Sequence, residues 1–227
     1  MTTPLMTSPA ATSVFAAPTR GKFISLEGGE GAGKSTLLAG LCDYIQAQGV
    51  PLLQLREPGG TALGEAIRAI VLDPARGGMV AEAELLLMFA SRAQLVRERI
   101  APALAAGQWV LCDRFADASY AYQGGGRGQP QERIAELERW ACAGLKPELT
   151  LLLDLPVAVG RARAAGRSEA DRIEVEADTF FERVRASYRA RAAAEPERFR
   201  VLDASQSPAQ VLHDAMAAIM HLFGAPA

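Results

Sequence analysis

The sequence predicts a three-layer α/β fold built on a five-stranded parallel sheet. Three observations support this prediction: short apolar runs alternate with helical patterns, the strand-like runs lack polar alternation, and a glycine-rich loop follows the first of them. Alternating strands and helices favour parallel strands joined by crossover helices. Strands that are apolar along their whole length are typical of a sheet covered on both faces.

Each expected strand is a short run rich in strand-forming residues. The second one ends in the sharp turn Glu57-Pro58-Gly59-Gly60, and the third, Trp109-Val110-Leu111-Cys112, is entirely apolar. The expected strands are residues 22–27, 50–56, 109–112, 149–153 and 199–202.

The expected helices carry apolar residues at a spacing of three or four. Gly49 ends the first helix near residue 48, Thr61 caps the next, and Pro102 stops or kinks the long helix over 81–100. A glycine-rich loop is expected at 123–128. The remaining helices are expected at 130–143, 157–165, 180–194 and 209–223.

Length and composition indicate one folded domain. The 227 residues are 49% hydrophobic and 22% charged, which suits a single domain over 21–227 after a flexible extension over 1–20. The net charge of −2 gives no attraction toward nucleic acid or an anionic membrane, and no apolar run reaches the roughly 20 residues of a membrane-crossing helix. The extension lacks the pattern of a secretory signal, and three scattered cysteines indicate reduced thiols. We therefore expect a cytoplasmic protein.

A glycine-rich loop connects the first expected strand to the first expected helix. It fits the pattern G-x-x-x-x-G-K-[ST], which binds nucleotide phosphates in this context. Glycines let the backbone curl so that several N–H groups point at phosphate oxygens. Lys34 can reach the β- and γ-phosphates, and Ser35 can hold Mg²⁺. The residues expected to bind the nucleoside triphosphate are Gly28, Gly29, Glu30, Gly31, Ala32, Gly33, Lys34, Ser35 and Thr36.

Strand-end residues carry the next signal, because ligands of such sheets bind at the carboxyl ends of the strands. Asp113 and Asp154 each end a strand and could hold the metal ion; Asp113 is favoured because Arg114 follows it. Arg56, Arg92 and Arg114 come from separate segments that could converge on one anion. Planar guanidinium groups suit phosphate, so this set favours a kinase that clamps an acceptor phosphate in line with the donor.

A cluster of arginines, broken by a glycine and a serine, follows the fourth expected strand. We expect residues 161–175 to form a lid that closes over the phosphates, excludes water and supplies transition-state charge. The arginines of this lid are Arg161, Arg163, Arg167 and Arg172.

Five segments, taken together and in order, resemble the thymidylate kinase family. They are the phosphate loop, Arg56-Glu57-Pro58-Gly59-Gly60-Thr61, Asp113-Arg114-Phe115, Ala121-Tyr122-Gln123-Gly124 and Asp171-Arg172-Ile173-Glu174. The resemblance extends from Lys22 to the last helix. It implies the nucleoside monophosphate kinase fold with a P-loop, and transfer of the γ-phosphoryl group of ATP to dTMP with Mg²⁺, giving dTDP for dTTP biosynthesis. It also implies a homodimer packed through helices.

The same resemblance assigns roles by position. Arg56, Arg92 and Arg114 would hold the phosphate or base of dTMP, and Glu57 would lie beside the acceptor phosphate. Ser119 and Gln123 would reach the thymine edge or stack near it, and Glu30 would approach the sugar 3′-hydroxyl. The residues that would contact dTMP are Glu30, Arg56, Glu57, Met88, Phe89, Arg92, Arg114, Ser119 and Gln123.

The catalytic set implied by the resemblance includes an arginine from the lid. No arginine lies between Gly28 and Lys34, a pattern that in this family accompanies a transition-state arginine supplied by the lid. Arg167 matches that arginine best, with Arg163 and Arg172 as neighbours. The catalytic residues are then Lys34, Asp113, Arg114, Arg163 and Arg167.

One position departs from the family pattern. The family commonly has a phenylalanine that stacks on thymine one helical turn before the arginine matched by Arg92. Here that residue is Met88, with Phe89 next to it. Either side chain could cover the base.

Three alternative functions differ in their sequence requirements. A kinase for another nucleoside monophosphate or for a deoxynucleoside would share the loop and lid and differ only in its base pocket. A GTP-dependent switch reads guanine through Asn-Lys-x-Asp, and this chain contains no asparagine. A motor-type ATPase places glutamate directly after its metal-binding aspartate, where this chain has Arg114 or Leu155. The kinase reading is favoured.

Overall fold

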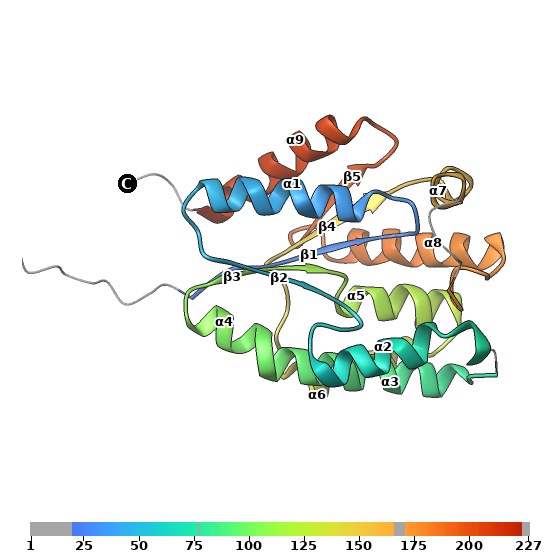
Figure 1. Cartoon of the computed structure of the whole chain (residues 1–227). Coiled ribbons are helices and arrows are strands. Elements are labelled where there is room, and N and C mark those ends of the chain that lie inside the picture. The colour runs from blue at the N-terminus through green and yellow to red at the C-terminus, as the bar shows by residue number, and fades with distance from the viewer. Residues whose placement is uncertain (1–19, 77, 166–170, 224–227) are drawn as a thin grey trace, which may run out of the picture.

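Five parallel strands form the centre of the fold, which confirms the predicted α/β class (Figure 1). The computed structural model describes residues 20–76, 78–165 and 171–223. The sheet has the order β2-β3-β1-β4-β5, and each neighbouring pair is parallel. The strands are β1 (Phe23–Gly28), β2 (Leu52–Arg56), β3 (Trp109–Asp113), β4 (Leu149–Asp154) and β5 (Phe199–Asp203).

Nine α-helices accompany the sheet in the described ranges. Two of them begin with side-chain caps, of which Thr61 was predicted: the Thr61 and Ser207 side chains accept hydrogen bonds from the backbone N–H groups of Gly64 and Gln210. The helices are α1 (Lys34–Ala47), α2 (Ala62–Leu72), α3 (Ala81–Leu95), α4 (Ala101–Ala105), α5 (Ala116–Ser119), α6 (Gln131–Cys142), α7 (Val157–Ala164), α8 (Asp178–Ala194) and α9 (Pro208–Ile219).

The helices cover both faces of the sheet and make the fold three-layered. In Figure 1, α1 and α9 lie on one face, and α3, α4, α5 and α8 lie on the other. Successive residues of β1 point to opposite faces: Ile24 and Leu26 pack into the α1–α9 core, whereas Phe23 packs with α3 and α4 residues. Every residue of β1 is buried, including the polar Ser25 and Glu27, because helices cover the strand on both sides.

The long helix continues through Pro102, so of the two predicted outcomes, a stop or a kink, the stop is wrong. After α3 the chain passes through a π-helical turn, Val96–Ile100, and then into α4. Proline lacks a backbone N–H and clashes with the preceding turn of a regular helix. Here Pro102 lies at the start of α4, directly after the wider turn, where proline is tolerated.

The glycine-rich segment that was predicted as a loop is instead helical up to Gly126. A π-helical segment, Tyr120–Gly126, continues α5 and packs along α8. A Cβ atom on Gly125 would lie 2.8 Å from the Arg183 carbonyl oxygen, and one on Gly126 would lie 2.4 Å from the Phe180 ring. The glycines therefore permit close contact with α8; they do not mark a turn.

The described segments expected to bind ligands meet at the carboxyl edge of the sheet. The P-loop follows β1, the turn after Arg56 follows β2, and Asp113 and Arg114 follow β3. Of the predicted lid, residues 166–170 lie outside the described residues, as does nearly all of the expected N-terminal extension.

Candidate active site

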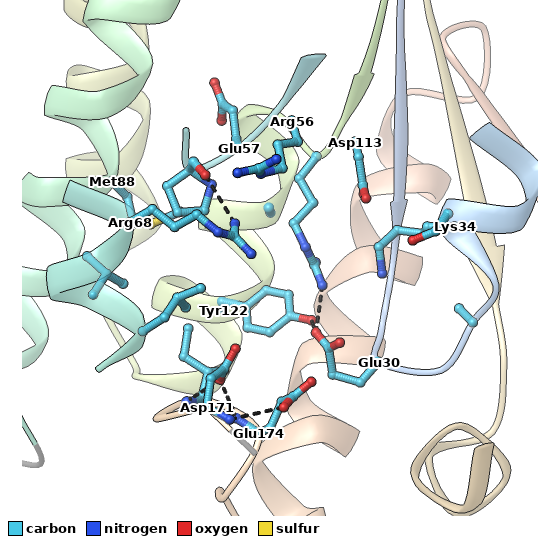
Figure 2. Close-up of a pocket in the computed structure, with 18 of the residues that line it drawn as sticks. Glu30, Lys34, Arg56, Glu57, Arg68, Met88, Asp113, Tyr122, Asp171 and Glu174 are labelled. Atoms are coloured by element: carbon cyan, nitrogen blue, oxygen red, sulfur yellow. Dashed lines mark hydrogen bonds and ion pairs between the residues drawn. The ribbon is translucent and has the colours of Figure 1, made fainter. Parts of the chain in front are cut away.

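A cavity of about 260 Å³ lies at this edge, between the P-loop and helices α2 and α3 (Figure 2). Its walls come from the P-loop, the turn after β2, the ends of α2 and β3, the segment around Tyr122, and the turn that begins at Asp171. Charged side chains line the cavity at the P-loop and also from α2, where Arg68 lies, and apolar side chains of α2 and α3 such as Met88 line the rest of that side. Such a cavity can take a ligand with an anionic end and a less polar end.

The P-loop is shaped for phosphate by its glycines and by Lys34. Gly31 has a φ of 69°, and a Cβ atom on it would lie 2.0 Å from the Gly160 carbonyl oxygen, so only glycine fits. The buried Lys34 Nζ donates hydrogen bonds to the carbonyl oxygens of Gly28 (3.0 Å) and Gly29 (2.9 Å). Lys34 also begins α1, whose N-terminus attracts anions. The loop thus brings together an ammonium group and a helix start.

Arg114 is held beside the P-loop in a strained backbone conformation. Its φ of 73° lies in the left-handed region, which non-glycine residues rarely adopt outside functional sites. Its guanidinium group donates to Glu30 Oε1 (2.7 Å), to the Gly28 carbonyl oxygen (3.2 Å) and to the Tyr188 hydroxyl (3.3 Å). It also lies 4.7 Å from the centre of the Tyr122 ring. These contacts fix a cation in the cavity wall.

Glu30 is kept ionised by its surroundings. Burial acts to raise the pKa of Glu30, but Arg114 and Lys34 outweigh burial, and the pKa lies below its usual value. Figure 2 shows the Glu30 carboxylate beside the Tyr122 hydroxyl, which donates to it at 3.1 Å, and Arg114 Nη2 donates to the same oxygen at 2.7 Å. A carboxylate that lines the cavity can accept a hydrogen bond from a ligand hydroxyl.

Of the two strand-end aspartates, Asp113 has the freer carboxylate. Asp113 Oδ1 is buried and has no hydrogen-bond partner among the residues described. Asp154 is instead bound by Arg185, whose Nε and Nη2 donate to its two oxygens at 2.7 and 3.0 Å. Ser35, at the start of α1, is exposed to the cavity. Asp113 and Ser35 therefore fit a hard cation better than Asp154 does.

The described chain holds no protein-only metal centre. No group of three or more His, Cys, Asp or Glu side chains within it is arranged to hold a metal ion. A cation at Ser35 and Asp113 would need further ligands from a bound nucleotide and water, which is how Mg²⁺ usually binds at phosphate sites.

Arg92 lies behind the cavity wall. It is fully buried, donates from Nε to Glu57 Oε2 at 2.7 Å, and donates to Ser119 Oγ and to the Phe115 carbonyl oxygen, both at 3.0 Å. Its guanidinium group lies 4.6 Å from the centre of the Phe89 ring. Of these five residues only Glu57 lines the cavity. The Arg92–Glu57 pair therefore positions the turn after β2.

Glu57 lines the cavity and has one carboxylate oxygen without a partner in the described part of the chain. Its Oε1 is buried and has no hydrogen-bond partner among the described residues. Burial raises the pKa of Glu57, although Arg92 acts in the opposite direction. An N–H or O–H group of a ligand or an ordered water would satisfy this oxygen.

Two arginines reach the cavity from its α2 side. Arg56 is exposed and pairs with Glu65 at 2.8 Å, and Arg68 donates to the Pro58 carbonyl oxygen at 3.1 Å. Sequence reasoning missed Arg68 because it considered strand ends, whereas Arg68 lies inside a helix. One signal in the sequence could have indicated Arg68. It follows the apolar Ile67 in a helix that comes directly after the turn at Arg56.

The apolar end of the cavity is built by Val71, Leu72, Met88 and Ile173. Met88 lines the cavity, whereas Phe89 does not and packs against Arg92. The amide of Gln123 is the polar group at this end, where it is almost fully buried.

Comparison with known proteins agrees with this geometry. A family model described as thymidylate kinase matches residues 26–215. The thymidylate kinase of Alkalilimnicola ehrlichii is 57% identical over 195 residues, which are 86% of this chain and 90% of that protein. The thymidylate kinase of Ectopseudomonas mendocina is 55% identical over 90% of this chain and 98% of its own length, and that of Alcanivorax borkumensis is 52% identical over 88% and 96%. The chain belongs to the thymidylate kinase family.

In this thymidylate kinase family member, the segment predicted as a lid is held by hydrogen bonds at both of its described ends. Arg161 donates to the Glu176 carbonyl oxygen at 2.9 Å, and Arg163 donates to the Ala204 carbonyl oxygen at 2.9 Å. Arg172 is buried and donates to the Val71 carbonyl oxygen at 2.7 Å. Arg167 lies outside the described residues.

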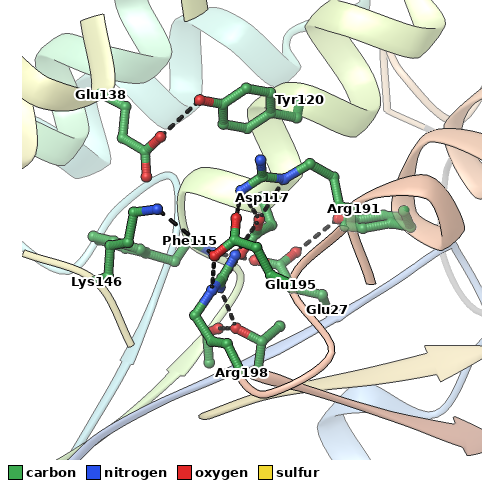
Figure 3. A network of polar contacts seen from close by, with 12 residues as sticks. Glu27, Phe115, Asp117, Tyr120, Glu138, Lys146, Arg191, Glu195 and Arg198 are labelled. Carbon is green, nitrogen blue, oxygen red and sulfur yellow. Dashed lines mark hydrogen bonds and ion pairs between the residues drawn. The ribbon is translucent and has the colours of Figure 1, made fainter. Parts of the chain in front are cut away.

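A buried carboxyl group supports the Arg114 segment from below (Figure 3). Glu27, at the end of β1, accepts from the Phe115 backbone N–H and from the Tyr188 hydroxyl, both at 2.7 Å. Burial, with the nearby Asp117 charge, raises the pKa of Glu27 to about 8. In Figure 3 the arginine side chains are directed at Asp117, so Glu27 has no arginine of its own there. Glu27 is therefore protonated at neutral pH.

Replacing Glu27 by glutamine should change how stability depends on pH. The folded pKa of Glu27 lies above its unfolded value near 4.5. Ionisation therefore favours the unfolded state, and wild-type stability falls as pH rises from about 4.5 to about 8, with a slope of up to about 1.4 kcal/mol per pH unit. The Glu27→Gln curve should lack this fall. Denaturant unfolding between pH 5 and 8.5 measures the stability of the wild type and of Glu27→Gln. Glu182→Gln, which replaces an exposed carboxyl group on α8, is the control. If the stability of Glu27→Gln depended on pH in the same way as that of the wild type, the raised pKa of Glu27 would be contradicted.

Proposed function

We propose that this chain transfers the γ-phosphoryl group of ATP to dTMP, forming dTDP for dTTP biosynthesis in the cytoplasm. The observation that carries the proposal is the single cavity that runs from the P-loop to a small, largely apolar end with one buried amide. Its polar end suits an acceptor phosphate next to the donor, and its apolar end suits a methylated pyrimidine. Membership of the thymidylate kinase family supports the same reaction.

In this proposal, the cationic rim binds the acceptor phosphate. Arg56, Arg68 and Arg114 all line the cavity and can approach one anion from different elements. Glu30 accepts a hydrogen bond from the sugar 3′-hydroxyl. Met88, not Phe89, covers the thymine ring, because only Met88 lines the cavity.

In this proposal, the wall that supports the acceptor nucleotide is held in place by Ser119, Glu57 and Arg92. Arg92 links Glu57 to Ser119 through hydrogen bonds of 2.7 and 3.0 Å and is fully buried. It therefore supports the wall against which the nucleotide binds. A fixed wall contributes to rate by holding the acceptor in line with the donor.

The ATP base would occupy a second cavity on the other side of the P-loop. This cavity measures about 280 Å³ and is lined by Gly33, Thr36, Arg163, Ala204 and Gln206, among others. The two cavities share Gly31, Ala32, Gly33 and Thr36. Donor and acceptor would thus meet over the P-loop.

Phosphoryl transfer here needs charge stabilisation more than proton transfer. The acceptor phosphate is already a nucleophile at neutral pH, so direct in-line transfer requires no general base and no covalent enzyme intermediate. Lys34, Arg114 and an arginine of the lid neutralise charge that spreads over the transferred group. Ser35 and Asp113 would hold Mg²⁺, which neutralises phosphate charge when bound.

Initial rates with ATP and each of dTMP, dUMP, dCMP, dGMP and dAMP test the function. We expect dTMP to have the highest kcat/KM, because the apolar end of the cavity can bury its methyl group. A preference for any purine acceptor would overturn the proposal. Rapid ATP hydrolysis without an acceptor would instead favour an ATPase.

We also propose that two copies of the chain form a homodimer through helices α2, α3 and α6. Large apolar side chains are exposed on all three: Leu63 (51%), Leu86 (58%) and Trp140 (81%). In Figure 1 these helices lie together at the edge of one layer. Exposed apolar groups gathered in this way favour an interface with a second copy.

The substitution Leu86→Asp should convert this dimer to a monomer at micromolar concentration, because it buries a charge in an apolar interface. Analytical ultracentrifugation measures the change in mass. Val201→Asp, which alters an equally exposed side chain on the distant edge strand β5, is the control. A monomeric wild-type protein, or a dimer that tolerates Leu86→Asp, would contradict this interface.

A further inference from the structure

Glu84 is a buried carboxylate that does not line the cavity itself. It links three segments of the chain near the apolar end of the cavity, where we place the nucleotide base. It lies on α3 and is 1% exposed. Oε1 accepts from Gln123 Nε2 at 2.9 Å, and Oε2 accepts from Arg172 Nη2 at 2.5 Å. Arg127 Nε lies 3.3 Å from Oε2. None of the functions described above uses this carboxylate.

The contacts of Glu84 keep it ionised. Burial acts to raise the pKa of Glu84, but hydrogen bonds from Gln123 and Arg172 and the charges of Arg127 and Arg172 outweigh burial, so the pKa lies below its usual value. An ionised carboxylate can only accept hydrogen bonds. Gln123 must therefore turn its NH₂ group toward Glu84.

This constraint leaves the carbonyl oxygen of the Gln123 amide for a ligand. Gln123 lines the cavity and is 1% exposed, and its Oε1 has no donor among the described residues. A buried acceptor without a donor is unfavourable, and a ligand N–H at this point would satisfy it. Thymine and uracil carry an N3–H donor. Cytosine has an unprotonated N3 acceptor in the same place.

We propose that Glu84 determines the base specificity of the acceptor site by fixing the Gln123 amide with its oxygen toward the base, so that N3–H pyrimidines bind and cytosine is rejected. This inference rests on the proposed function, because it requires dTMP in the cavity. Glu84 is a positioning residue that acts through Gln123. Arg127 and Arg172 belong to the same device, since they hold Glu84 in its charged, acceptor-only form.

The orientation of the Gln123 amide decides whether the site prefers thymine or cytosine. With Oε1 toward the base, cytosine N3 and Gln123 Oε1 would be two acceptors facing one another in a buried site. A site built to bond a donor rejects an analogue without it by a large factor, because a buried polar group is left unpaired. If the amide turned over, its NH₂ group could donate to cytosine N3.

The substitution Glu84→Gln tests the proposal, because a glutamine at 84 can either accept from or donate to Gln123. We expect the ratio of kcat/KM for dTMP to that for dCMP to fall at least about tenfold, with dCMP gaining in absolute terms. Glu82→Gln, the same charge change at an exposed position of α3, should leave the ratio unchanged. A merely structural role for Glu84 would lower both rates together and leave the ratio intact, which would overturn the proposal.

A double-mutant cycle with Gln123→Met separates action through Gln123 from other effects. Without the amide, Glu84→Gln should no longer change the dTMP-to-dCMP ratio. If Glu84→Gln fails to fold, the Kd values of dTMP and dCMP are measured for the wild type and for Gln123→Met. A ratio of dCMP Kd to dTMP Kd that is smaller in Gln123→Met than in the wild type supports the proposal, and an unchanged ratio overturns it. If wild type does not phosphorylate dTMP, the proposed function fails; if it does and the ratio resists Glu84→Gln, only the role of Glu84 fails.

Discussion

Replacing Arg114 by lysine should lower kcat/KM for dTMP by on the order of 10²- to 10³-fold. Lysine keeps the positive charge but not the planar fork that contacts Glu30, the Gly28 carbonyl oxygen and the Tyr188 hydroxyl together. The ammonium group would no longer be fixed between the P-loop and the acceptor. Since the proposed mechanism gives Arg114 a part in both acceptor binding and charge stabilisation, KM for dTMP should rise and kcat should fall.

The substitution Arg114→Lys should leave the backbone unchanged, so the two enzymes can be compared for the effect of the side chain alone. Arg114 has a φ of 73°, and lysine shares its β-carbon, so the conformational strain at this position is unchanged. Arg133→Lys, an exposed change on α6 remote from the cavity, should retain wild-type kinetics. Steady-state kinetics and thermal unfolding of both variants separate catalysis from folding. An Arg114→Lys enzyme with near-normal kcat/KM would remove Arg114 from the acceptor clamp.

The centre of the sheet could be predicted because β1, β3 and β4 are buried on both faces. That burial gives apolar runs such as Trp109-Val110-Leu111-Cys112, which are readable in a single sequence. The helix before Gly126 was not readable, because glycine disfavours helices and signals a turn. What makes it helical is contact with Phe180 and Arg183 of α8, which lie far along the chain. Tertiary packing therefore overrode local propensity.

The phosphate end of the site was predictable for a similar reason. Loop glycines and strand-end residues such as Asp113 have a fixed relation to the sheet edge, so their positions follow from the fold class. Roles that arise from side-chain contacts did not follow. The contact of Arg92 with the nucleotide stays a prediction, whereas its full burial and its hydrogen bond to Glu57 could not be read from the sequence. Glu84 gave no signal, because its partners come from separate elements.

Arg172 was predicted as one of four lid arginines and as a neighbour of Arg167, which the resemblance to the family matches best to the transition-state arginine. In the structure its Nε donates to the Val71 carbonyl oxygen and its Nη2 to Glu84. Both partners lie on the acceptor side of the molecule. Arg172 thus anchors one end of the lid, a role that depends on contacts and not on sequence position.

Replacing Arg167 by alanine should lower kcat by on the order of 10³-fold while changing KM for dTMP and ATP little. The other lid arginines have protein partners: Arg161 bonds the Glu176 carbonyl oxygen, Arg163 the Ala204 carbonyl oxygen, and Arg172 Glu84. The P-loop holds no arginine, so the resemblance to the family assigns the transition-state charge to Arg167. An arginine that acts only in the transition state affects kcat and not ground-state binding.

Arg163→Ala is the matched control for this prediction. Arg163 lines the second cavity, where we place the ATP base, so its loss should raise KM for ATP and reduce kcat by less than about tenfold. Single-turnover measurements with saturating ATP and dTMP compare the chemical step in both variants directly. If Arg163→Ala slowed that step more than Arg167→Ala, the transition-state charge would come from the start of the lid, beside α7, and not from its centre. Near-normal turnover in both variants would place that charge on Lys34 and Arg114 alone.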